Sequence, residues 1–80
     1  MKKEHLLRLI IKIDSTKKIG LGSSSMSEVK AIGRLIERSD QSVDNADKII
    51  DRLKSVDKLR LALEDSDWRN LKRDIEKILH

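Results

Sequence analysis

The sequence predicts an all-α protein, a small bundle of four to five short helices with a flexible Gly/Ser loop after the first element. Apolar residues recur at helical spacing along most of the chain. Serine and acidic residues of the kind that cap helices precede several of these segments. No segment offers a convincing strand-pairing partner. A length of 80 residues corresponds to a single helical domain, residues 1–80.

The first element, residues 4–13, can be interpreted in two ways. As a helix, its six leucines and isoleucines cover an apolar arc of about 200°, and Glu4, Arg8 and Lys12 form a polar stripe. As a strand, Leu7, Leu9, Ile11 and Ile13 alternate with Arg8, Ile10 and Lys12. We favour the helix because nothing else in the chain offers a second strand.

Residues 14–25 contain two glycines and a serine triplet, which predict a flexible loop. Ser25 and Glu28 then fit a capping box that opens a helix running to about Arg38. Its inner face is formed by Val29, Ile32, Leu35 and Ile36. Gly33 falls on the same face, where it either lets a second helix approach closely or is simply tolerated.

The rest of the chain divides at polar residues. Residues 39–42 form a break, and Ser42 is the predicted N-cap of the next helix. At Ser55 either a new helix starts or the old one kinks. Residues 65–67 break the chain again and cap the last helix. The apolar positions at helical spacing are Val43, Ala46, Ile49, Ile50 and Leu53, then Val56, Leu59, Ala62 and Leu63, then Trp68, Leu71, Ile75, Ile78 and Leu79.

Positive charge is concentrated in the N-terminal third. The net charge is +4, and residues 1–30 hold seven lysines and arginines against three acids, whereas residues 31–80 hold eleven of each. The alternative is that this is ordinary solubility charge. If a polyanion is bound, the predicted contacts are Lys2, Lys3, Arg8, Lys12, Lys17 and Lys18.

The composition argues against several protein classes. Without cysteine there is no disulfide scaffold and no thiolate metal site. The longest apolar run is three residues, so no membrane span is expected, and the default compartment is the cytoplasm. Gly20-Leu21-Gly22 lacks the Gly-Lys-Ser/Thr of a P-loop, although the serines behind it could cradle a phosphate. We predict no enzyme, no catalytic residues, no metal and no cofactor.

One segment resembles a known family. Residues 35–43, followed by Ala46, Ile49, Ile50 and Leu53, resemble the paired helices of ribbon-helix-helix repressors. The resemblance implies that residues 7–13 form a strand that pairs across a dimer and reads the major groove, with Arg8, Ile10 and Lys12 facing DNA. The chain departs from the family because about 12 residues separate the strand from the helix and a further 25 follow.

These features predict a non-catalytic regulatory or adaptor protein that binds another protein through a helical face. Trp68, Arg69 and Lys72 are the predicted partner contacts, because tryptophan is enriched at binding hot spots; the alternative is that Trp68 closes the core. The second functional prediction is a basic DNA-binding transcriptional regulator that uses the N-terminal third on duplex DNA. We expect a monomer or a homodimer, of the size and composition typical of phage, plasmid or bacterial accessory proteins.

Overall fold

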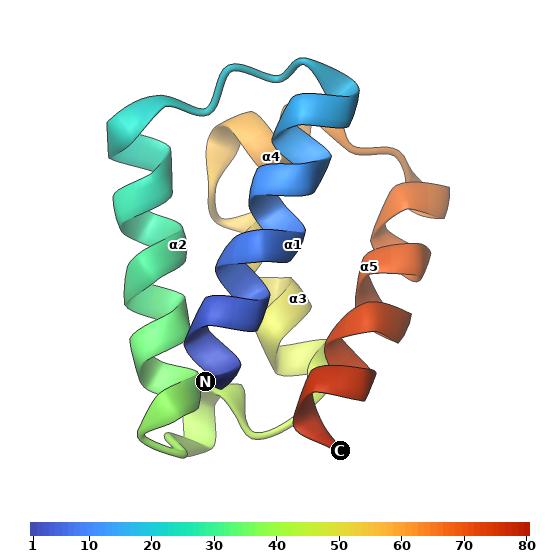
Figure 1. Cartoon of the computed structure of the whole chain (residues 1–80). Coiled ribbons are helices and arrows are strands. Elements are labelled where there is room, and N and C mark those ends of the chain that lie inside the picture. The colour runs from blue at the N-terminus through green and yellow to red at the C-terminus, as the bar shows by residue number, and fades with distance from the viewer.

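The computed structural model describes residues 1–80 and consists of helices joined by short connections (Figure 1). The α-helices are α1 (Lys2–Lys17), α2 (Gly22–Glu37), α3 (Ala46–Lys54), α4 (Asp57–Ala62) and α5 (Asp65–Leu79). The 3-10 helix η1 (Gln41–Val43) precedes α3. There is no strand, so the predicted all-α bundle is confirmed.

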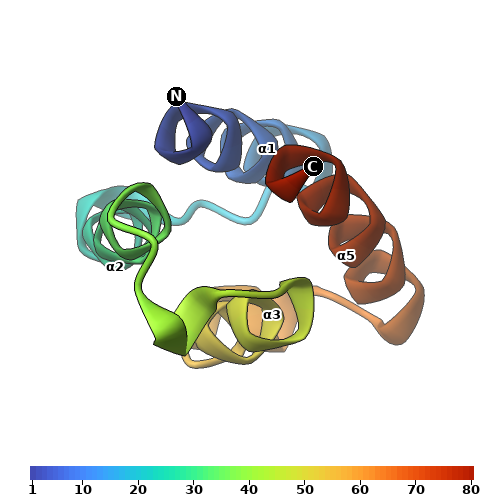
Figure 2. The same ribbon diagram turned by 90° about the horizontal axis from the view of Figure 1, so that it is seen from below.

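The long helices surround one hydrophobic core. Seen from below, α1, α2, α3 and α5 enclose a common centre (Figure 2). α1 packs against both α2 and α5, while α3 and α4 close the opposite side (Figures 1 and 2). Seventeen buried hydrophobic residues form a single cluster, to which every α-helix contributes. Burial of these side chains supplies the main driving force for folding.

The ambiguity over residues 4–13 is resolved in favour of a helix. All of them lie in α1, so the strand implied by the resemblance to ribbon-helix-helix repressors is wrong. Only Leu6 and Ile10 of the apolar arc are fully buried, whereas Ile11 is 54% exposed. The arc is wider than the surface that α2 and α5 can cover, because a helix packed against two neighbours still has an outer face.

The connection after α1 is much shorter than the predicted loop of residues 14–25. α1 continues to Lys17 and α2 begins at Gly22, so only residues 18–21 connect them. Asp14 lies inside α1, and its Oδ1 accepts the backbone N–H groups of Gly20 (2.8 Å) and Leu21 (3.2 Å). Lys58 Nζ donates to the Gly20 carbonyl at 3.0 Å. Burial of Leu21 holds this connection against the core and outweighs the low helix propensity of the serines that follow it.

Gly33 lies where α1 packs closely against α2. It is buried, and a Cβ atom added to it would lie 2.8 Å from Lys3 Cγ and 3.5 Å from Lys3 Cα. A methyl group at this position would therefore require the Lys3 side chain to move, and a larger side chain would push the two helices apart. Of the two interpretations given for this glycine, close helix approach is the one that the packing supports.

The helix starts differ from the sequence expectations in their capping residues. α2 begins three residues before Ser25, so the predicted capping box is wrong. α3 is capped by Asn45, whose side chain accepts the Lys48 amide, and not by Ser42. A new helix does begin after Ser55, which ends α3. α5 starts with a capping box between Glu64 and Asp67.

Candidate functional site

The six cations predicted to bind a polyanion all lie on α1 or directly after it, but they do not form one patch. Lys2 and Lys3 lie at the start of the helix and Lys17 and Lys18 at its end. At 1.5 Å per residue these pairs are about 22 Å apart along the axis. Arg8 and Lys12 are the two that the structure brings together, one turn apart on the exposed side of α1.

Lys17 is neutralised by an acid from a later helix. Its Nζ lies 3.0 Å from Asp67 Oδ1 on α5. The backbone N–H of Glu64 and the Lys17 ammonium together hold the pKa of Asp67 below its usual value. Lys17 therefore stabilises the contact between α1 and α5 and is less available to an external anion than the other five cations.

The amino terminus is also engaged within the bundle. The Met1 ammonium pairs with Glu37 at the end of α2, and the Lys3 backbone N–H donates to the same carboxylate at 3.2 Å. These contacts lower the pKa of Glu37, with the bond from the amino terminus as the main cause. The Glu37 carboxylate is therefore paired with groups at the start of the chain.

A row of cations that the sequence analysis did not select lies along α2 and ends at Arg38, the residue directly after the helix. Lys30, Arg34 and Arg38 are all exposed and recur at every fourth position. None of them belongs to any of the five ion pairs of the structure. The spacing i, i+4, i+8 within a predicted helix is the signal that could have identified them.

A groove runs between α1 and α5. Its two adjoining hollows have volumes of about 240 and 380 Å³ and share Leu9, Lys12 and Asp74. Leu71 and Ile78 contribute further apolar surface from α5. The remaining side chains that line it are His5, Arg8, Ile13, Thr16, Lys17, Asp67, Asn70 and Lys77. The groove thus combines apolar surface with charged side chains, and most of the cations come from α1.

The predicted partner contacts lie beside a different hollow. Trp68, Arg69 and Lys72 line a space of about 300 Å³ between α3 and α5. Trp68 is only 8% exposed, and Lys54 Nζ lies 5.6 Å from the ring centroid. The indole therefore belongs to the core, so that of the two interpretations given for Trp68 its burial supports the one in which it closes the core.

Lys72 is also held within the protein. Its Nζ forms a 2.8 Å ion pair with Asp47 Oδ1, and this partner raises the pKa of the lysine. Of the three predicted partner contacts, Arg69 is the one that is both exposed and outside any ion pair.

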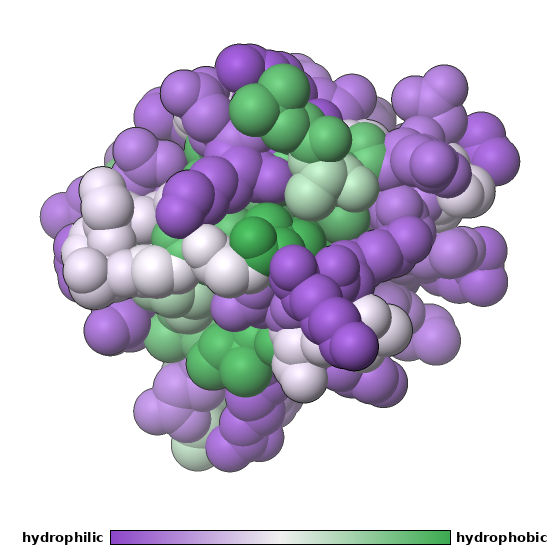
Figure 3. Space-filling model, turned by 90° about the horizontal axis from the view of Figure 1, so that it is seen from above, coloured by the Kyte–Doolittle hydropathy of each residue, from purple (hydrophilic) through white to green (hydrophobic).

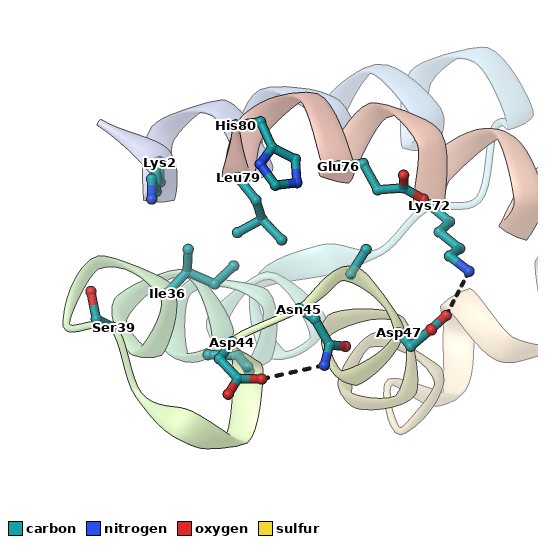
Figure 4. A pocket seen from close by; sticks show the side chains of 12 residues that line it. Lys2, Ile36, Ser39, Asp44, Asn45, Asp47, Lys72, Glu76, Leu79 and His80 are labelled. Atoms are coloured by element: carbon teal, nitrogen blue, oxygen red, sulfur yellow. Dashed lines mark hydrogen bonds and ion pairs between the residues drawn. The ribbon is translucent and has the colours of Figure 1, made fainter.

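The largest hollow, about 500 Å³, lies at the end of the bundle where both termini are found (Figures 1 and 4). Two of its three acidic side chains already have basic partners, whereas Glu76 forms no ion pair. Asp47 pairs with Lys72, as Figure 4 shows, and Asp44 pairs with Lys48 at 2.9 Å. Nowhere in the chain do three or more His, Asp or Glu side chains gather closely enough to hold a metal ion.

Hydrophobic atoms at the opposite end of the bundle form patches between hydrophilic side chains (Figure 3). Leu61 on α4 is the most exposed of the aliphatic side chains within the helices, at 80%. A single exposed leucine is common on protein surfaces and does not define a binding site. None of the helices is both long and apolar enough to cross a membrane.

Comparison of the chain with protein-family models, with curated proteins and with solved structures finds no match.

Proposed function

We propose that the protein is a non-catalytic regulatory or adaptor protein that binds a protein partner through the groove between α1 and α5. The observation that carries this proposal is apolar surface that remains accessible between two packed helices. Leu9, Ile13 and Ile78 line the groove and are only partly buried, although Leu9 and Ile13 pack against the core. Covering such surface on association is favourable in proportion to the apolar area removed from water.

The charges beside the groove indicate the chemistry of the partner. Arg8 and Lys12 are exposed and form no ion pair. Of the two acids on the α5 side, Asp67 is already paired with Lys17, so that Asp74 is the one unpaired acid against these two cations. A partner helix that places leucine or isoleucine in the groove and acidic residues beside Arg8 and Lys12 is complementary to this surface. This mode corresponds to an amphipathic helix in a hydrophobic groove.

Site-specific photo-crosslinking in the native host tests this assignment. A photo-reactive residue at Arg8 or Thr16, both beside the groove, should give the same discrete protein adduct. The control places the same residue at Asp51, which is exposed on α3, and should give no such adduct. Equal labelling from all three positions, or no adduct from the groove positions, contradicts the proposal.

A second candidate function is supported by the distribution of charge between the two parts of the bundle. Residues 1–38, which contain α1 and α2, hold nine lysines and arginines against four acids. Residues 39–80 hold nine against ten. We propose on this ground that the α1–α2 side binds duplex DNA through its phosphates, as a basic transcriptional regulator would.

Titration with a labelled DNA duplex at 50 and 200 mM salt tests the second candidate. Binding that weakens steeply with salt is expected, since each neutralised phosphate releases condensed counterions. Absence of binding at both salt concentrations removes this function. The protein-partner proposal is unaffected by that result because its groove lies between α1 and α5.

A further inference from the structure

We infer that the exposed face of α2 is the surface that contacts duplex DNA, with Lys30, Arg34 and Arg38 binding phosphates beside the hydroxyls of Ser23 and Ser27. The inference rests on the second candidate function and assigns DNA binding to residues other than the six cations on and directly after α1. It differs from the sequence-based expectation, which placed the polyanion on Lys2, Lys3, Arg8, Lys12, Lys17 and Lys18.

The geometry of the helix brings these five residues to one side. At about 100° per residue they fall within an arc of about 80°. The buried residues Val29, Ile32 and Ile36 lie on the opposite side, so the arc points away from the core. From Lys30 to Arg38 the row extends about 12 Å along the axis, which is comparable to the width of the major groove, about 12 Å.

None of the cations of this face forms an ion pair, although Asp40 lies close enough to Arg38 for the two charges to interact. α2 contains two acids, Glu28 and Glu37. Glu28 lies about 160° around the helix from Lys30, and Glu37 is held by the amino terminus and the Lys3 amide. By contrast, Lys48 and Arg60 on the other side of the bundle each pair with an aspartate of their own segment.

The side chains that the face lacks argue against other partners. The face consists of serine, alanine, lysine and arginine. The large hydrophobic residues that are exposed all lie outside it: Met1, Ile11 and Leu61. A membrane surface needs such apolar side chains for insertion, and the face has neither of the two aromatic residues, tryptophan and tyrosine, that are enriched with arginine at protein hot spots. Single strands need stacking rings, and the only aromatic residue, Trp68, is buried.

The experiment compares two triple variants with equal loss of charge. The test variant changes Lys30, Arg34 and Arg38 to glutamine. The control changes Arg69, Arg73 and Lys77, which are exposed on α5 at the same i, i+4, i+8 spacing and form no ion pair. Each variant is first checked for native helix content by circular dichroism. Affinity for a labelled DNA duplex is then measured by fluorescence anisotropy between 50 and 200 mM salt.

The expected result follows from counterion release. Three phosphate contacts contribute about −2.7 to the slope of log affinity against log salt, which is about a fortyfold loss of affinity between 50 and 200 mM salt. The α2 variant should lose this part of the slope and bind at least about tenfold more weakly at 50 mM salt. The α5 variant should stay close to the wild type in both measurements.

Several results would overturn the inference. Equal weakening of both variants would show that net charge alone governs binding. The α2 variant could bind DNA as the wild type does, while changing Arg8, Lys12 and Lys18 to glutamine abolishes binding. That result would show that the protein binds DNA through α1 and not through α2. No binding by the wild-type protein would remove the second candidate function as well. Equal affinity of the wild type for polyglutamate, single-stranded DNA or anionic vesicles would also refute duplex recognition.

Discussion

The close approach of α1 to α2 at Gly33 leads to a prediction about coupled mutations. Replacing Gly33 with alanine adds a methyl group 2.8 Å from Lys3 Cγ, 3.4 Å from Lys3 Cβ and 3.5 Å from Lys3 Cα. Carbon atoms in optimal contact are about 3.5–4.0 Å apart. Only the contact with Lys3 Cγ is severely short, and that atom belongs to a side chain that can move.

The magnitude is the difference between two opposing effects. Alanine in a helix interior is favoured over glycine by about 1 kcal/mol. Displacing Lys3 from its rotamer costs about 0.5–1.5 kcal/mol. Gly33→Ala in the wild-type background should therefore change the free energy of unfolding by no more than about 0.5 kcal/mol. In a Lys3→Ala background the clash with Cγ is absent, and the same change should stabilise the protein by about 1 kcal/mol.

Urea denaturation of the four proteins, followed by far-UV circular dichroism, measures this double-mutant cycle. We expect a coupling free energy of about 1 kcal/mol between positions 3 and 33, which is typical of residues in contact. If Gly33→Ala stabilises the protein by the same amount in both backgrounds, the two helices are not in contact at this point. Gly33 would then have no role in the close packing of α1 on α2.

Three further predictions concern the core, the tryptophan and the α5 cap. Leu53→Ala, at a fully buried position, should lower the free energy of unfolding by about 2–5 kcal/mol. Leu61→Ala, at an 80% exposed position, should change it by less than about 0.5 kcal/mol. Equal losses of stability in urea denaturation of the two variants would contradict the packing. Trp68 should fluoresce at short wavelength and resist quenching by acrylamide because it is buried, and red-shifted, readily quenched emission would place it at the surface. The pKa of Asp67 is below its usual value of 3.8, so its carboxylate stabilises the fold above that pH and the effect disappears as the pH falls through the lowered pKa. Asp67→Asn should therefore lower the melting temperature at neutral pH, with a difference from the wild type that narrows in strong acid; a difference that does not change with pH would contradict this.

Part of the candidate site could be predicted from residue spacing alone. Arg8 and Lys12 are one helical turn apart, so their shared exposed side follows once residues 4–13 are a helix. The pairing of Lys17 with Asp67 could not be predicted, because 49 positions separate them and only the packing of α1 on α5 brings them within 3.0 Å. The burial of Trp68 likewise depends on α3, which supplies Lys54 above its ring.

The local pattern of apolar and polar residues determined that this chain is helical and which side of α2, α3 and α5 faces inward. Helical periodicity is a property of neighbours three and four positions apart, so it can be detected without knowledge of the fold. Tertiary structure alone decided which part of the wide apolar arc of α1 became core and left Ile11 exposed. It also decided the length of the connection after α1, because burial of Leu21, the hydrogen bonds that Asp14 accepts and the one that Lys58 donates outweigh local preference there. Burying a side chain against a distant segment stabilises the fold by more than the difference in helix propensity between two residues. Helix boundaries predicted from propensity alone are therefore shifted by tertiary packing.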